Sequence, residues 1–270
     1  MTTLEEVKEF WNRSSCGEIY AEGDNLKAQY ESEKAKRYQF EPYILEFGAF
    51  KEAENQVVLE IGVGMGADHE QLAISNPKAL YGIDLTERAI HHTKLRLDLL
   101  NLNSRLEVGN SEDLHFKNDF FDWVYSWGVL HHSPDTQQAI SEVYRVLKPG
   151  GKAKVMIYHK YSWVGLLLWL RYALLAMKPW RSMNFIYAHY LESPGTKAYT
   201  VSEATKLFSG FSKVTVVPQL SFGDLLEGEV GQRHRHWSLL VLKKMWPRRA
   251  IKKISQFFNL GLYLLIEAKK

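Results

Sequence analysis

Residues 57–66 read VVLEIGVGMG and residues 79–84 read ALYGID, and these two stretches decide the fold. The first is an apolar run that ends in three glycines at alternate positions, which is typical of a buried strand that turns tightly into a helix. The second ends in Asp84, twenty-two residues after Gly62. A carboxylate at this point can accept hydrogen bonds from both hydroxyls of a ribose. The two stretches therefore predict a nucleotide-type ligand at the ends of neighbouring parallel strands.

Strand-like and helix-like segments alternate along the chain. The expected strands are residues 57–61, 79–84, 105–108, 122–127, 152–158, 213–217 and 262–268, and the expected helices are residues 67–74, 86–101, 136–147 and 201–208. A cation, a proline and two glycines at residues 148–151 predict the end of the third helix. Alternation at this spacing predicts βαβ units. We therefore expect an α/β fold, with a Rossmann-like seven-stranded sheet and helices on both faces.

Two segments do not fit this alternation of strands and helices, and we interpret them as insertions at the ends of the sheet. The expected divisions are a helical N-terminal extension or lid at residues 1–50, a core at 51–158, an apolar helical insertion at 159–198, and a completion of the sheet at 199–270 with a basic insertion at about 219–260. The first insertion follows the carboxyl end of the fifth strand, where ligands bind in open α/β sheets.

Composition excludes several classes of protein. With 46% apolar and 24% charged residues, the 270-residue chain is expected to fold, and its net charge of +3 is too small to argue for a nucleic-acid partner. One cysteine, Cys16, excludes an internal disulfide framework and a CxxC metal site. The acidic, polar residues 1–10 do not predict a secretory signal. Residues 163–177 are broken by Arg171 and shorter than a membrane span. We therefore expect a cytoplasmic protein without a metal.

The glycine loop alone leaves two classes of enzyme open. The pattern Gly62-x-Gly64-x-x-Ala67 also satisfies the dinucleotide fingerprint, so a nicotinamide-dependent dehydrogenase is a rival reading of these residues. Glycines in an ordinary strand–helix turn are a weaker reading, because Asp84 follows at the right distance.

The segments that follow the loop favour one of these classes. The run VLEIGVGMG…YGIDLT…LEVGNSEDLHF…FDWVYSWGVLHH…EVYRVLKPGGKAKV, over about residues 57–158, resembles the class I S-adenosylmethionine-dependent methyltransferases. Its core is similar to the ubiquinone-biosynthesis and arsenite methyltransferases. The LKPGG and VLHH segments are not expected of a nicotinamide-binding domain. The resemblance implies S-adenosyl-L-methionine as cofactor, S-adenosyl-L-homocysteine as product, and no metal.

The resemblance also assigns cofactor contacts position by position. It implies that the methionine end is bound by Glu60, Gly62, Gly64, Gly66 and Trp127, the ribose by Asp84, and the adenine by Leu85, Asn110, Ser111 and Glu112. Many relatives carry aspartate where this chain has Asn110. Which side chain reads the adenine amino group therefore stays open.

The catalytic residues are harder to assign, because methyl transfer from a sulfonium can rest on positioning and exclusion of water. His131 and His132 follow the fourth strand and are the candidates for a general base or an orienting group. A structural role is the favoured alternative, since the VLHH segment occurs in relatives with unrelated substrates. His159 is a similar candidate. His234 and His236 lie in a basic run that forms either a cationic substrate clamp or, the favoured reading, a solvated loop.

The insertions bear on the substrate. Residues 162–177 are apolar nearly all round, so they cap the substrate pocket, pack on a second subunit or lie on a membrane surface. The basic, amphipathic residues 243–258 form a lid helix with a solvated face, the favoured reading, or contact anionic lipid. Arsenite is rejected as acceptor because holding the metalloid needs several cysteines.

We therefore expect methyl transfer to a small hydrophobic or amphipathic molecule, with peripheral membrane contact and a homo-oligomer as open alternatives. The accepting atom stays open among oxygen, nitrogen, sulfur and carbon. The alternative functions are methylation of a protein or RNA, cofactor binding without catalysis and, more distantly, a nicotinamide-dependent dehydrogenase.

Overall fold

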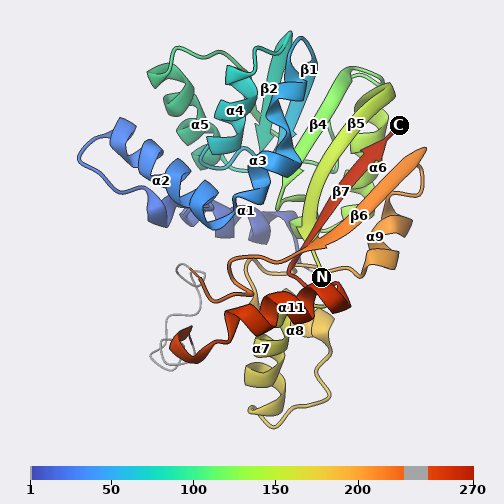
Figure 1. Ribbon diagram of the computed structural model, residues 1–270. Coiled ribbons are helices and arrows are strands. Elements are labelled where there is room, and N and C mark those ends of the chain that lie inside the picture. The colour runs from blue at the N-terminus through green and yellow to red at the C-terminus, as the bar shows by residue number, and fades with distance from the viewer. Residues whose placement is uncertain (1, 228–242) are drawn as a thin grey trace.

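The computed structural model describes residues 2–227 and 243–270, and a single seven-stranded sheet forms its centre (Figure 1). The strand order is β3-β2-β1-β4-β5-β7-β6. The strands are β1 (Val57–Ile61), β2 (Ala79–Asp84), β3 (Arg105–Val108), β4 (Phe121–Trp127), β5 (Leu147–Tyr158), β6 (Lys213–Gln219) and β7 (Tyr263–Lys269). Strand β7 is antiparallel to both of its neighbours, whereas β1 to β5 pair in parallel. The predicted α/β fold is confirmed.

Strand β5 begins five residues earlier than predicted. The segment Lys148–Gly151 was expected to stop a helix, and the helix does end just before it, but β5 already begins at Leu147. The backbone N–H of Gly150 donates to the carbonyl oxygen of Lys270 at 3.0 Å, and the N–H of Lys270 donates to Gly151 at 3.0 Å. Pairing with the end of the chain therefore extends the strand through the proline and glycines.

Helices cover both faces of the sheet. They are α1 (Leu4–Arg13), α2 (Leu26–Phe40), α3 (Tyr43–Gly48), α4 (Ala67–Ile74), α5 (Glu87–Leu99), α6 (Thr136–Val146), α7 (Trp163–Trp169), α8 (Met183–Tyr190), α9 (Val201–Leu207) and α11 (Arg248–Phe258). Short 3₁₀ turns are η1 (Glu18–Tyr20), η2 (Phe50–Ala53) and η3 (Leu130–His132), and η4 (Leu170–Leu174) is a π-helical turn. None of the helices in the described ranges is long and apolar enough to cross a membrane.

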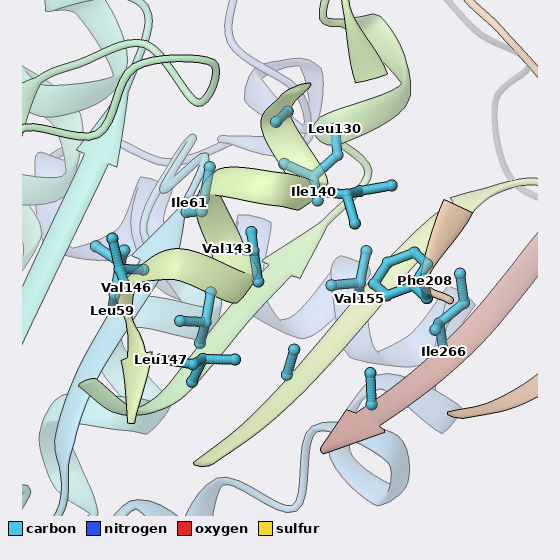
Figure 2. Close-up of a cluster of buried hydrophobic side chains, with 14 of the residues drawn as sticks. Leu59, Ile61, Leu130, Ile140, Val143, Val146, Leu147, Val155, Phe208 and Ile266 are labelled. Carbon is cyan, nitrogen blue, oxygen red and sulfur yellow. The ribbon is translucent and has the colours of Figure 1, made fainter. Parts of the chain in front are cut away.

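The core follows from the alternation of side chains along the strands. Leu59 and Ile61 of β1 face the side covered by α6 and α9, whereas Val58 faces α3 and α4. Figure 2 shows the first of these clusters, in which Val143 of α6 and Phe208 beside α9 pack on the sheet. Because apolar residues point to both faces, the strands read as continuous apolar runs, as expected for a sheet buried on two sides.

A third cluster lies at the carboxyl end of β5 and the amino end of β7, which are neighbours because the two strands are antiparallel. There Leu168 of α7, Ala173 of η4 and Tyr187 of α8 pack against Tyr158 and Tyr263. We call residues 163–191 together with residues 243–258 the cap, because α7, η4, α8 and α11 form one group at one end of the molecule (Figure 1). The cap therefore sits beside the end of the sheet at which ligands are expected.

Ion pairs fasten the N-terminal extension to the core, one of them buried and one partly exposed. Arg96 of α5 is only 1% exposed and bonds Glu33 of α2 and, at 3.1 Å, Glu70 of α4. Arg88 of α5 bonds Glu18 of η1, with Nε 2.9 Å from the carboxylate. One helix of the core thus holds two elements of the extension.

We expect Arg96→Met to destabilise the protein strongly. The substitution leaves the Glu33 carboxylate buried without its bonded cation, while Glu70 keeps Lys34 at 2.8 Å, and breaking a buried pair in this way typically costs about 3–5 kcal/mol. Lys94→Met, on an exposed face of the same helix, is the matched control and should change the free energy of unfolding by less than about 0.5 kcal/mol. Urea denaturation of both variants measures the difference, and equal stabilities would show that Arg96 does not anchor the extension.

Candidate functional site

A cavity of about 220 Å³ lies at the carboxyl ends of β1, β2, β4 and β5. The sheet order reverses between β1 and β4, which is where open α/β sheets leave a crevice for ligands. The glycine loop forms one wall, and the N-terminal extension forms the opposite one with residues of α1 and α2. The cavity therefore lies at the strand ends where the sequence predicts a nucleotide-type ligand.

The glycine loop has left-handed backbone at each of its three glycines. At Gly62, where φ is +86°, an added Cβ would lie 2.0 Å from a methyl carbon of Val129, so the loop needs glycine to pack against the segment after β4. At Gly64, where φ is +52°, an added Cβ would meet nothing within 4 Å. Gly64 therefore leaves open room inside the cavity for a ligand to approach the backbone.

Asp84 ends β2 beside this loop. One carboxylate oxygen accepts from the backbone N–H of Gly64 at 3.2 Å, and the other accepts from the N–H and the hydroxyl of Thr86, both at 2.9 Å. Burial raises the pKa of Asp84, and these hydrogen bonds oppose the rise. Asp84 thus fixes the loop to β2 while it lines the cavity, in a position that fits a ribose.

Glu60 forms a fully buried pair with His69. The distance from the Glu60 carboxyl to Nδ1 is 2.8 Å, and Nε2 lies 2.8 Å from the hydroxyl of Ser104, which itself donates to the carbonyl of Leu80. Burial lowers the pKa of His69 to about 3 and raises that of Glu60 well above its usual range. All three groups are satisfied when Nε2 carries the imidazole proton and Glu60 is protonated, so the pair is neutral.

The residues predicted for the adenine divide into two sets. Leu85, Asn110 and Ser111 line the cavity. Glu112 does not, because its carboxylate accepts from the N–H of Asp135 at 2.8 Å and from the hydroxyl of Ser133, at the start of α6. The Oδ1 of Asn110 accepts from the backbone N–H of Glu112 at 3.0 Å, which leaves the amide NH₂ as the group that Asn110 can offer to a ligand.

An aromatic wall continues the cavity beyond the loop. Trp127 of β4 lies edge-on to Tyr263 with ring centroids 5.9 Å apart, and Tyr263 stacks on Tyr158, also at 5.9 Å. Glu41 accepts hydrogen bonds from Tyr43, at 3.2 Å, and from Tyr263. Sequence reasoning found Trp127 and missed the other four, although Tyr158 and Tyr263 stand at strand ends that it had located.

Helix α2 contributes an arginine to the same wall. Arg37 bonds Asp68 through two parallel contacts of 2.9 and 2.6 Å, and the hydroxyls of Tyr38 and Tyr125 donate to the same carboxylate. Burial opposes the charged guanidinium, but Asp68 raises the Arg37 pKa well above its usual value. The cation is therefore permanently charged and already paired.

The candidate catalytic histidines occupy different environments. His132 lines the cavity, with Trp11 of α1 edge-on to its ring at 5.3 Å between centroids. His131 is fully buried away from the cavity, against Tyr158. His159 is also buried, and its Nδ1 lies 3.0 Å from the carbonyl of Gly261. The structure therefore brings only His132 to the cavity, whereas His234 and His236 lie outside the described residues.

His132 is held in its neutral form. Its Nδ1 lies 2.8 Å from the hydroxyl of Ser193 and 3.1 Å from that of Thr196, and Nε2 lies 3.5 Å from the carboxylate of Glu192. Burial, together with the nearby charge of Lys197, lowers the pKa of His132 to about 3. The carboxylate beside Nε2 favours the tautomer that carries its proton there.

Cys16 belongs to the same wall. Cys16 lines the cavity, next to other residues of the N-terminal extension. Burial raises the pKa of the thiol to about 12, with the Glu192 charge adding to the effect. Cys16 is therefore a neutral thiol in the N-terminal extension and is not a thiolate nucleophile.

Comparison with known proteins identifies the domain that builds this site. Residues 59–155 match the family described as Methyltransferase domain. Phosphoethanolamine N-methyltransferase 2 of Caenorhabditis elegans is 35% identical over 119 residues, which are 43% of this chain and 26% of that protein. Sterol 24-C-methyltransferase of Pneumocystis carinii is 30% identical over 113 residues, 41% and 29% respectively. The chain thus spans between a quarter and a third of the length of these relatives.

A solved structure supports the fold over the whole chain. Phosphoethanolamine N-methyltransferase 2 of Haemonchus contortus, in complex with S-adenosyl-L-methionine, superposes with a TM-score of 0.60 at 17% identity. The match covers 100% of this chain and 60% of that one. At this identity the likeness concerns the fold alone.

We expect Gly64→Ala to weaken cofactor binding without unfolding the protein. The methyl group would occupy the open room in the cavity, so the affinity for S-adenosyl-L-homocysteine should fall at least about tenfold. Gly150→Ala is the matched control, because Gly150 also has positive φ and open space around it but lies outside the cavity. Both should lose about 1–2 kcal/mol of stability from left-handed strain. Calorimetric titration that finds equal affinities would place the cofactor elsewhere.

We also expect His132 to make stability depend on pH in a defined direction. Its folded pKa of about 3 lies below the unfolded value near 6.5, so the unfolded state binds the extra proton and stability falls as the pH drops below 6.5. Between pH 6 and 4, wild type should therefore lose up to about 1.4 kcal/mol per pH unit more than His132→Gln.

Denaturant unfolding at a series of pH values measures this difference. His115→Gln, on the exposed side chain next to Glu107, is the control and should run parallel to wild type. Parallel curves for His132→Gln as well would mean that His132 is not kept neutral in the folded protein.

Proposed function

Because the chain carries a class I S-adenosylmethionine-dependent methyltransferase domain, we propose that the protein methylates a small amphipathic acceptor that is uncharged or cationic. One observation carries the proposal. A single cavity joins the glycine loop and Asp84 to an aromatic wall built by Tyr158, Tyr263 and the N-terminal extension. One half fits the cofactor, and the other half offers a water-poor place for an acceptor.

The residues of the first half suit the cofactor. Gly64 leaves room beside the loop, Asp84 presents a carboxylate for the ribose, and the amide of Asn110 reaches the edge expected for the adenine. When bound, S-adenosyl-L-methionine supplies a methyl group on a positively charged sulfur, and the acceptor's lone pair forms the new bond as the carbon–sulfur bond breaks. Trp127 lies at the methionine end, where it excludes water.

The charge of the second half selects among acceptors. Glu41 and Glu192 line it together with Glu33, which Arg96 already pairs, whereas Arg37 is the one lysine or arginine that the described residues bring to the cavity, and Asp68 already neutralises it. An anionic acceptor would meet this excess of carboxylates unfavourably. The nematode relative's name implies phosphoethanolamine for that protein, but a phosphate would need cations that this wall does not offer.

Proton removal is assigned to Glu192. Its carboxylate accepts from the hydroxyl of Tyr158 at 2.6 Å and stands 3.5 Å from Nε2 of His132. Since the low pKa of His132 makes the imidazole a poor base, we assign His132 to positioning and Glu192 to accepting a proton from the acceptor. A half-buried carboxylate beside aromatic rings also suits a basic acceptor group.

The remaining parts of the proposal concern the extension and the location. Leu4, Val7 and Trp11 of α1 line the cavity, which supports residues 1–50 as a lid that covers bound ligands. The cytoplasmic location and the division of the chain at residues 50, 158 and 198 remain predictions from the sequence.

The experiment uses S-adenosyl-L-methionine with a trideuterated methyl group. The protein is incubated with separate pools of amines, neutral amphiphiles, and carboxylic or phosphorylated compounds, and mass spectrometry detects products that appear as labelled and unlabelled pairs. We expect pairs in the first two pools only. Products confined to the anionic pool would overturn the acceptor class. Products found only when protein or RNA is the acceptor would overturn the small-molecule proposal.

A variant then tests the assigned base. Glu192→Gln should lower kcat by a factor of about 10² or more while the affinity for S-adenosyl-L-homocysteine stays within about twofold. Glu203→Gln, at an exposed carboxylate outside the cavity, is the control. A kcat for Glu192→Gln close to that of wild type would remove Glu192 from the chemistry.

A further inference from the structure

The cap exposes large apolar side chains to an extent found nowhere else in the described chain. Among residues 2–227 and 243–270, six large apolar side chains are more than 60% exposed, and all six belong to the cap. They are Leu175, Met177, Trp180, Met245, Phe257 and Phe258. An exposed set of this kind marks a surface that another body covers.

These side chains do not cover the substrate cavity. No residue of 163–191 or 243–258 lines it, so the sequence interpretation of residues 162–177 as a pocket cover does not account for them. The inward face of the same segment is occupied, because Leu168 and Ala173 pack on Ile186 and Tyr187 of α8. The exposed residues are therefore a second, outward face of the cap.

The two segments of the cap form one body. The indole N–H of Trp163 in α7 donates to the hydroxyl of Ser255 in α11 at 2.8 Å, and the rings of Trp163 and Trp246 meet edge to face. Ile251 and Ser255 are buried on the inner side of α11, while Lys252, Lys253 and Phe257 are exposed. Helix α11 is thus amphipathic, with its cations and aromatic rings directed outward.

The cap is also strongly cationic. Residues 163–191 and 243–258 hold nine lysines and arginines and no aspartate or glutamate, so the other 25 cations of the chain stand against all 31 of its carboxylates. Arg171, Lys178, Lys244, Arg249, Lys252 and Lys253 make no ion pair with another described residue. The cap therefore carries a net positive charge on a chain whose remainder is net negative.

We propose that the cap docks on the surface of a bilayer that contains anionic phospholipid. Exposed aromatic and aliphatic side chains interleaved with unpaired lysines and arginines match the two requirements of interfacial binding, apolar insertion and attraction to acidic headgroups. A second copy of this chain fits less well, because a two-fold contact would bring the nine cations of each cap together. The proposal does not depend on which molecule the cavity methylates.

Flotation of the full-length protein with vesicles tests the proposal. We expect binding to phosphatidylcholine vesicles that contain phosphatidylserine, weak binding to phosphatidylcholine alone, and a steep loss of binding as salt is raised. Lys252→Glu with Lys253→Glu should weaken binding by roughly tenfold or more, since each cation near an anionic surface contributes about fivefold. Phe257→Ser with Phe258→Ser should also weaken binding, by removing the apolar anchor.

Control variants and a fluorescence measurement distinguish docking by the cap from a general effect of charge on vesicle binding. Lys94→Glu with Lys117→Glu makes the same change of charge at exposed positions outside the cap and should leave vesicle binding within about twofold. All variants should bind S-adenosyl-L-homocysteine like wild type, which shows that they fold. In wild type, lipids brominated in their acyl chains should quench tryptophan fluorescence, and Trp180→Tyr should reduce that quenching.

Three results would overturn the proposal. One is absence of binding to any vesicle. Another is equal loss of binding in the cap pair and in the Lys94 and Lys117 pair, which would indicate only net charge. The third is a stable dimer in sedimentation that Phe257→Ser with Phe258→Ser dissociates without any effect of lipid, which would make the cap a subunit interface.

Discussion

The close approach of the first glycine to the segment after β4 is the constraint on which the site depends. A side chain at Gly62 would collide with Val129, so this turn holds the ends of β1 and β4 at a separation that only glycine permits. The sheet order reverses at the same place, which opens the cavity. Asp84 then fixes the loop from the neighbouring strand through the N–H of Gly64. Fold and ligand site are therefore built by the same few backbone contacts.

Local sequence patterns predicted the glycine loop and Asp84. The residues of the aromatic wall were missed because long-range contacts bring them together. Gly64 and Asp84 can be recognised from the sequence, because glycine is typical of tight turns and Asp84 stands at the end of a predicted strand. Glu41 joins Tyr263 across 222 positions of the chain, a contact that no local pattern encodes. Long-range contacts also affect a residue that the sequence did single out. The resemblance places Glu112 beside the adenine, but its carboxylate accepts a hydrogen bond from the N–H of Asp135 at the start of α6.

The histidines show why adjacency in sequence does not decide function. His131 and His132 share the short turn η3, yet the turn directs one ring into the core beside Tyr158 and the other to the cavity beside Trp11. Burial lowers the pKa of both, so neither ring is charged at neutral pH. The fixed charges around the cavity are then carboxylates together with the paired Arg37. This balance of charges is the basis for proposing an acceptor that is not anionic, and it is a property of packing that composition alone does not reveal.

The cap brings the proposed membrane contact next to the cavity through shared side chains. Tyr158 and Tyr263 stack on each other in the cavity wall, and they are also members of the cluster that packs Leu168 and Tyr187 of the cap. The cap and the cavity wall are therefore connected by close-packed residues. An amphipathic acceptor partitions into the interface of a bilayer. Docking by this face would hold the aromatic half of the cavity close to the membrane surface where such an acceptor concentrates. Membrane docking and methylation of an amphipathic acceptor would then be served by the same arrangement of the chain.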